Sequence, residues 1–133
     1  MEVIVRLLLD THALLWWTTG DASLPERARR RIAQSQDPVI ISAVSAWEIA
    51  IKVNLGRLPS GATELIRDFE ESLKQDGFQS MSITADHGIR AGLLPGRHKD
   101  PFDRMLIAQA QAENLVIVSN DSVFDRYGVS RIW

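Results

Sequence analysis

The stretch Val-Ile-Val-Arg-Leu-Leu-Leu-Asp-Thr-His-Ala-Leu-Leu-Trp-Trp (residues 3–17) predicts a buried strand that passes directly into a helix. The apolar run ends at Asp10, so the sequence places a carboxylate where the strand leaves the protein core. A carboxylate that is buried alone costs several kcal/mol or is forced to take up a proton. The position of Asp10 therefore indicates that a nearby group compensates its charge.

Strand-like and helix-like segments alternate along the rest of the chain. The expected strands are residues 3–9, 39–41, 78–83, 115–118 and 129–133, and the expected helices are residues 11–18, 23–36, 43–55, 62–75, 85–93 and 101–113, with a single turn at 122–125. We expect Ser23 and Glu26 to form a capping box at the start of the second helix. The alternation predicts an α/β fold with a mainly parallel sheet.

Composition limits the classes of function. The chain has 133 residues, enough for one domain over residues 1–133 with its own core. Its formal net charge of −2 gives no global attraction for nucleic acid, so such binding must come from a local patch or a metal. Cysteine is absent, which excludes thiolate zinc sites and fits a reducing cytoplasm. Arg6, Asp10 and His12 interrupt the apolar N-terminal stretch, so we expect neither a targeting nor a membrane-spanning segment.

Three further acidic residues occupy positions that predict burial. Asp121 closely follows an apolar run, as Asp10 does, whereas Glu48 and Asp103 fall on the apolar faces of predicted helices. In parallel sheets with right-handed connections, strand ends and the starts of the following helices meet at one edge. One pocket can therefore receive all four carboxylates, which suit Mg²⁺ or Mn²⁺. The sequence predicts a metal-dependent enzyme that acts on phosphate.

Each of these acids also has a purely structural interpretation. Asp10 can cap the helix that follows it, and Asp121 can occupy a turn. Glu48 can complete a capping box behind Ser45, and Asp103 can do the same behind a cap at the preceding loop. Taken singly these interpretations are the simpler ones, but one shared metal site explains all four positions together.

Four blocks of the sequence resemble the motifs of the PIN domain. The blocks are Leu-Leu-Leu-Asp-Thr-His-Ala-Leu-Leu-Trp-Trp (7–17), Ile-Ser-Ala-Val-Ser-Ala-Trp-Glu-Ile-Ala-Ile-Lys (41–52), His-Lys-Asp-Pro-Phe-Asp-Arg-Met-Leu-Ile-Ala-Gln-Ala (98–110) and Val-Ser-Asn-Asp (118–121). They are most similar to VapC-type toxins of bacterial toxin–antitoxin modules. The resemblance implies a three-layer α/β/α sandwich with a sheet of about five strands. It also implies a Mg²⁺- or Mn²⁺-dependent endoribonuclease, a cognate antitoxin protein and a homodimer.

The resemblance implies roles for individual residues by position. The catalytic and metal-binding acids are expected to be Asp10, Glu48, Asp103 and Asp121, the first and third as direct ligands and the others directly or through water. We expect three residues to support the site: Ser119, Asp100 and Thr11. Asp100 is the expected helix cap, and Ser119 is expected to orient a ligand or water. The implied reaction is RNA hydrolysis that leaves a 5′-phosphate and a 3′-hydroxyl.

Basic and aromatic residues provide candidate contacts with partners. The expected contacts with the RNA backbone are Arg97, His98, Lys99 and Arg104, which surround the acidic block, and antitoxin contacts are the alternative for these residues. The arginines at residues 27–31 are expected on a solvated helix face, with contact to RNA phosphate as the alternative. His87 is expected at the surface. The tryptophans Trp16, Trp17 and Trp47 are expected in the core or in a homodimer interface.

Other enzyme classes that place an acid after the first strand fit less well. A haloacid-dehalogenase pattern needs a second Asp two residues after Asp10, where His12 stands, and no Gly-rich phosphate loop is present. The remaining rival is a catalytically weak PIN-like module that binds RNA or protein. The complete set of acids argues against it, and chelator-sensitive RNA cleavage distinguishes the two.

Overall fold

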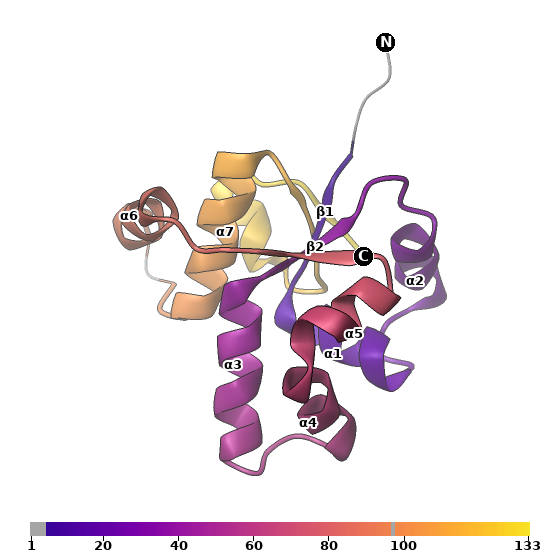
Figure 1. The fold of residues 1–133 in the computed structure, drawn as a ribbon. Helices are drawn as coiled ribbons and strands as arrows, with labels where there is room; N and C mark the ends of the chain where they lie inside the picture. Colours follow the sequence, from indigo (N-terminus) through magenta and orange to yellow (C-terminus); the bar gives the residue numbers. More distant parts are fainter. Residues whose placement is uncertain (1–4, 97) are drawn as a thin grey trace.

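The computed structural model describes residues 5–96 and 98–133, and it is built around one parallel sheet (Figure 1). The five strands lie in the order β3-β2-β1-β4-β5, and every neighbouring pair is parallel. They are β1 (Leu7–Leu9), β2 (Val39–Ser42), β3 (Phe78–Met81), β4 (Val116–Val118) and β5 (Arg131–Ile132). The first two residues of the expected strand 3–9 lie outside the described residues. The expectation of a parallel five-stranded sheet is confirmed.

Helices cover both faces of this sheet. They are α1 (Thr11–Thr19), α2 (Glu26–Ala33), α3 (Ala43–Asn54), α4 (Ser60–Arg67), α5 (Phe69–Gln75), α6 (Ala85–Leu93) and α7 (Pro101–Glu113), with a 3-10 helix η1 (Ser122–Tyr127). In Figure 1, α6 and α7 lie on the opposite side of the sheet from α2, α4 and α5. Within the described residues, no helix combines the length and the apolar character that crossing a membrane requires.

The alternation of side chains along the strands divides the core into two parts. Leu7 and Leu9 pack with residues of α1, α2, α4 and α5 on one face, whereas Leu8 packs with residues of α7 and η1 on the other. This follows from the two-residue period of a strand. Leu8 and Leu9 are fully buried, and burial of each contributes about 2 kcal/mol. The three-layer α/β/α sandwich is therefore confirmed.

The strand order positions the functional edge of the sheet. β1 is central, with β2 and β3 on one side and β4 and β5 on the other. The order thus reverses between β1 and β4, and ligands of open parallel sheets bind beyond the carboxyl ends of strands at such a switch point. The backbone N–H of Asp10 donates to the carbonyl of Val118 at 3.1 Å, which holds the ends of β1 and β4 together.

Two predicted helices differ from the structure. The segment 62–75, expected as one helix, forms α4 and α5, which meet at Asp68 with φ −140° and ψ 62°. Its apolar residues pack into the same core on both sides of the break, so their spacing did not reveal it. The expected capping box of Ser23 with Glu26 is wrong, because Pro25 is the N-cap and α2 begins at Glu26. The backbone N–H of Ser23 instead donates to Asp21 in a turn.

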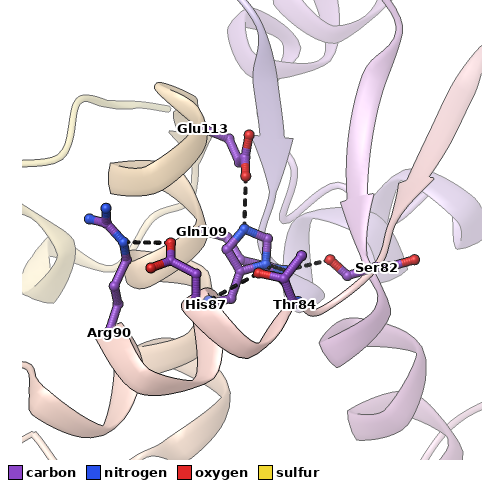
Figure 2. A network of polar contacts seen from close by, with 7 residues as sticks. Ser82, Thr84, His87, Arg90, Gln109 and Glu113 are labelled. Carbon is purple, nitrogen blue, oxygen red and sulfur yellow. Dashed lines mark hydrogen bonds and ion pairs between the residues drawn. The ribbon is translucent and has the colours of Figure 1, made fainter.

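His87 joins α6 to α7 in a buried polar network (Figure 2). Its Nδ1 accepts from the backbone N–H of Thr84 at 3.1 Å and lies 3.3 Å from Nε2 of Gln109. The ring therefore carries its proton on Nε2, which donates to Oε1 of Glu113 at 2.9 Å. The Thr84 hydroxyl in turn accepts from the N–H of His87, completing a capping box at the start of α6.

The expectation that His87 lies at the surface is therefore wrong, since the residue is only 2% exposed. The face of α6 that carries His87 and Ala91 packs against α7, whereas the apolar side chains of Ile89 and Leu93 face solvent. Packing partners rather than hydrophobicity decide which side of this short helix is buried.

Candidate active site

The structure brings the carboxylates of Asp10, Glu48, Asp103 and Asp121 to one cleft of about 490 Å³. Each comes from a different part of the sheet edge: the end of β1, the second turn of α3, the start of α7 and the segment before η1. Among the described residues, no group of three or more His, Asp or Glu side chains is arranged to hold a metal ion. The four acids share a cleft, but at least two of them are turned towards basic partners.

Asp10 is held from two sides. It is the N-cap of α1, and its Oδ1 accepts from the backbone N–H of Ala13 at 2.8 Å. The residue is only 6% exposed, and this burial raises the pKa of its carboxyl group; nearby Glu48 raises it further. Hydrogen bonds from the hydroxyl of Ser119 and from Ala13 oppose the shift. The side chain of Asp10 therefore both caps α1 and lines the acidic cleft.

Glu48 projects from the buried face of α3 and is 9% exposed. Its Oε2 accepts from Nζ of Lys52, one turn along the helix, at 2.9 Å. The N-cap of α3 is Ser42, so the interpretation of Glu48 as a capping-box acid behind Ser45 is wrong. The sequence interpretation missed Lys52, although a Glu followed by a Lys four residues later predicts such a pair.

Thr11 and Ser45 connect the two helices that begin nearest the cleft. The hydroxyl of Thr11, at the start of α1, donates to the hydroxyl of Ser45 in α3 at 3.0 Å. Both residues are buried, and Thr11 also lines the cleft. A buried bond of this kind fixes the relative positions of the helices that carry Glu48 and the cap Asp10.

Asp103 lies in the first turn of α7, whose N-cap is Asp100. Oδ1 of Asp100 accepts from the N–H groups of Phe102 at 2.9 Å and of Asp103 at 3.2 Å, as expected for a helix cap. Oδ2 of Asp103 lies 2.9 Å from Nε2 of His98. Burial raises the pKa of Asp103 to about 6, and Asp100 and Asp121 add to the rise, whereas the bond to His98 opposes it.

Ser119 links the acids at the ends of β1 and β4. Its Oγ accepts from the backbone N–H of Asp121 at 3.0 Å and also bonds the carboxylate of Asp10. Asp121 caps η1, with its Oδ1 accepting from Val123 at 3.0 Å. Ser119 is fully buried, and its expected role in orienting a ligand or water stays a prediction. It supports the site by orienting two carboxylates.

Arg104, expected to contact RNA, instead binds backbone carbonyls. Its guanidinium donates to the carbonyl oxygens of Ala91 (3.0 Å), Gly92 (3.4 Å), Leu94 (2.7 Å) and His98 (3.2 Å). These bonds fasten the end of α6 and the residues after it to α7, and Arg104 does not line the acidic cleft. Arg97, the neighbouring RNA-contact prediction, lies outside the described residues.

Other residues complete the wall of the cleft. They include His12, Trp16, Asn120 and Ser122, and of these Trp16, Asn120 and Ser122 were not predicted from the sequence to lie at the site. The rings of His12 and Trp16 stack with centroids 5.5 Å apart. Their proximity in sequence to Asp10 or Asp121 was the available signal. Trp47, in contrast, is 58% exposed on α3, with its ring centroid 5.1 Å from that of Phe102.

The donor set fits a hard divalent cation. All four acids offer carboxylate oxygens, the ligands that Mg²⁺ and Mn²⁺ prefer. The pKa values of Asp10 and Asp103 are raised because burial and neighbouring acids disfavour the ionised forms. A divalent cation would relieve both effects at once.

Comparisons with known proteins agree with this geometry. The model of the PIN domain family matches residues 7–129. The tRNA(fMet)-specific endonuclease VapC of Shigella flexneri is 26% identical over 127 residues, which are 94% of each protein. The fold is similar to VapC20 of Mycobacterium tuberculosis, a Sarcin-Ricin loop cleaving toxin (TM-score 0.69, 17% identity, 96% of this chain and 98% of that one). It is also similar to a chain of a toxin-antitoxin complex from Klebsiella pneumoniae (TM-score 0.67, 15% identity, 96% and 97%).

Proposed function

This chain belongs to the PIN domain family, and from that premise we propose that it is a metal-dependent endoribonuclease, the toxin of a toxin–antitoxin module. The observation that carries the proposal is the single cleft at the β1–β4 switch point, lined by acids from four different elements. A tRNA-specific endonuclease related over nearly the whole chain supports RNA as the substrate class. Two of these acids, Asp10 and Glu48, are buried beside the half-buried Asp103, and such a group of carboxylates is expensive without a cation, which supports a metal requirement.

Four carboxylates would hold Mg²⁺, or Mn²⁺, in the cleft. Asp10 and Asp103 are the proposed direct ligands, and Glu48 and Asp121 complete the site directly or through water. Such an ion supplies charge neutralisation at the phosphodiester and lowers the pKa of water. Hydrolysis then breaks the bond between phosphorus and the 3′ oxygen, leaving a 5′-phosphate and a 3′-hydroxyl.

The surrounding residues orient and compensate the acids. Ser119 and the N–H of Ala13 fix the carboxylate of Asp10. Nε2 of His98 holds Oδ2 of Asp103, and Nζ of Lys52 holds Oε2 of Glu48. The two basic partners reduce repulsion among the acids and restrict the directions in which they point. This preorganisation is what an electrostatic active site requires.

Partners are proposed from surface features and from relatives. The similarity to a protein of a toxin–antitoxin complex supports a cognate antitoxin as the partner. Trp47 and Ile51 of α3 and the C-cap residue Leu55 follow one another at intervals of four residues and are exposed, which supports a protein interface such as that of a homodimer. We place the protein in the cytoplasm, with residues 1–133 forming one domain.

The experiment is RNA cleavage by purified protein. We expect cleavage in Mg²⁺ or Mn²⁺, none in EDTA, and recovery when the ion is restored. Asp10→Asn should abolish cleavage, whereas the matched surface change Asp21→Asn should leave it unchanged. Sequencing the 5′ ends of the fragments would then define the cut site. Metal-independent cleavage, or RNA binding without cleavage, would contradict the proposal and favour a binding module.

A further inference from the structure

A second cleft with the opposite charge lies beside the acidic one. It has a volume of about 420 Å³ and is lined by Pro95, Gly96, His98, Lys99, Arg126 and Tyr127. Among the described residues that line it are two cationic side chains and no carboxylate. In a protein with a net charge of −2, this basic cleft is a local exception. Local basic surface is what an acidic protein needs in order to hold a polyanion.

The two cations are available to a ligand. Within residues 5–96 and 98–133, none of the ion pairs involves Lys99 or Arg126. Both residues are exposed. This distinguishes them from Arg104, whose donors are occupied by backbone carbonyls, and from Arg131, which pairs with Asp125.

Tyr127 forms a fixed aromatic wall of the basic cleft. Its side chain packs against the core between the sheet and α7, and its backbone carbonyl accepts from Nε2 of Gln111 at 3.1 Å. Its hydroxyl closely approaches Gly96, where an added Cβ would lie 3.2 Å from the Tyr127 oxygen. Gly96 also has φ +93°, so a side chain there would be strained and crowded. The ring is therefore held rigidly, with no side chain from residue 96 covering it.

The walls of the basic and acidic clefts are connected to each other at two places. His98 lines the basic cleft, and its Nε2 bonds Asp103, which lines the acidic one. The helix η1 connects them as well, because Ser122 at its start lines the acidic cleft and Arg126 and Tyr127 at its end line the basic cleft. A ligand chain that passes through the acidic cleft can therefore continue into the basic one.

We propose that the basic cleft binds a nucleotide adjacent to the scissile phosphate of single-stranded RNA. The base stacks on Tyr127, and the phosphate contacts Lys99 and Arg126. Aromatic platforms flanked by cations are the common means of binding single-stranded nucleic acid. This inference rests on the proposed ribonuclease function and extends it from the reacting phosphate to a neighbouring subsite.

A flexible acidic peptide is the competing occupant. Lys99 and Arg126 would attract the carboxylates of such a peptide. A flexible peptide chain would gain little, however, from stacking on the aromatic ring of Tyr127. The ring of Tyr127 lines the same cleft as both cations, and this combination favours a planar base attached to a phosphate.

The first test separates stacking from charge in a binding measurement. The probe is a fluorescent single-stranded RNA of about 12 mixed nucleotides, titrated with the Asp10→Asn protein in Mg²⁺ so that the RNA stays intact. We expect Tyr127→Leu to weaken binding about tenfold and Tyr127→Phe to bind as the parent does. Lys99→Gln should lower the slope of log affinity against log salt by about 0.7, whereas Tyr127→Leu should leave the slope unchanged.

The matched control is Lys74→Gln. Lys74 is exposed near the end of α5, just before β3 and so at the opposite edge of the sheet from the clefts. We expect Lys74→Gln to change the RNA affinity and the salt slope less than Lys99→Gln does. Thermal melting verifies that Tyr127→Leu is folded, and Lys99→Gln and Arg126→Gln provide surface changes that do not touch the core.

Cleavage kinetics provide the second readout. In the otherwise wild-type protein, Lys99→Gln and Arg126→Gln should raise KM several-fold and change kcat little, because they act on binding of the flanking nucleotide. Equal RNA affinity and KM for the parent and all subsite variants would overturn the subsite, while cleavage by the parent would still support the ribonuclease.

The converse outcomes are also distinguishable. A parent protein that binds RNA through Tyr127 and Lys99 but never cleaves it would support the subsite and contradict the ribonuclease. If polyglutamate instead displaces RNA with the same dependence on Tyr127 and Lys99, the basic cleft is a site for acidic peptide, and the nucleotide proposal is overturned.

Discussion

The helix α7 carries a histidine–carboxylate pair at each end, and the two pairs differ in their neighbours. At the start of α7, His98 lies 2.9 Å from Asp103, and near its end His87 lies 2.9 Å from Glu113. Burial raises the pKa of Asp103 to about 6, and the nearby acids Asp100 and Asp121 add to the rise. The His87 pair has no such acidic surroundings among its described contacts. The like-charged neighbours, and not the bond to histidine, therefore mark the functional end of the helix.

Burial is distributed in opposite ways in the two pairs. The imidazole of His87 is 2% exposed, while the Glu113 side chain is 44% exposed. The histidine is therefore part of the packed interior, and the carboxylate is in contact with solvent. The side chains of His98 and Asp103 are both 23% exposed at the cleft. Apart from Oε1 of Gln109, the network at His87 satisfies its buried side-chain polar atoms. The pair at the end of α7 therefore mainly stabilises the fold, whereas the pair at its start positions a carboxylate in the acidic cleft.

Removal of the carboxylate at each end is the strongest way to test this contrast. We expect Asp103→Asn to lower RNA cleavage by about a thousandfold or more, because a catalytic acid is lost. Glu113→Gln, which makes the same chemical change at the other end of α7, should keep cleavage within about twofold of wild type. Initial rates in Mg²⁺ measure both, and equal losses would remove the distinction between the two ends.

Removal of each histidine should give the reverse order for stability. His87→Ala should lower the free energy of unfolding by about 3 kcal/mol, since it leaves a cavity and unpaired donors at Thr84 and Gln109. His98→Ala should lower it by less than about 1 kcal/mol, because that ring is partly exposed. Urea denaturation in EDTA measures both. In Mg²⁺ titrations His98→Ala should bind the ion about tenfold more weakly, as expected for a group that orients a metal ligand.

Substitution of Arg104 tests whether its hydrogen bonds to backbone carbonyls hold the loop before α7. Arg104→Gln removes most of the donors to four carbonyls, and we expect a loss of about 2 kcal/mol in unfolding free energy. The salt dependence of RNA binding should stay unchanged, since the guanidinium is not offered to phosphate. The control is Arg90→Gln, which breaks only an exposed pair with Asp86 and should cost less than about 0.5 kcal/mol. A reduced salt slope in Arg104→Gln would instead support the predicted contact of Arg104 with RNA.

The smallest expected effect is the pH dependence of stability without metal. Burial raises the pKa of Asp103 in the folded protein to about 6, from an ordinary value of 3.8. Between these values the folded state binds more protons than the unfolded state, so stability should fall as the pH rises from about 4 to above 6. We expect a change of about 1 kcal/mol after allowance for solvent screening. Chemical denaturation in EDTA at several pH values measures it, and Asp103→Asn should reduce the slope.

The acids could be predicted from sequence because each has a local signal. Asp10 and Asp121 follow apolar strands, and parallel strands bring their carboxyl ends to one edge. Asp100 followed by Pro101 marks the start of α7, which the structure reproduces. The sheet and its layers follow in the same way from the alternation of strands and helices.

Features that depend on tertiary packing could not be predicted in this way. The buried side of α6 is chosen by the match of His87 with Gln109 and Glu113, against the hydrophobicity of Ile89 and Leu93. The basic cleft combines residues from the loop before α7 with Arg126 and Tyr127 of η1, and no local pattern joins them. The full burial of Ser119 could not be predicted either, because the burial of a small hydroxyl residue leaves no pattern in the sequence.

The pairing of β1 with β4 has a consequence during protein synthesis. Asp10 is made early, but Ser119 and Asp121, which complete its surroundings, follow after most of the described chain. A nascent chain that has formed β1, β2 and β3 therefore exposes only half of the nuclease cleft. The acidic cleft is complete only when β4 inserts beside β1, so β1, β2 and β3 alone cannot form a working nuclease.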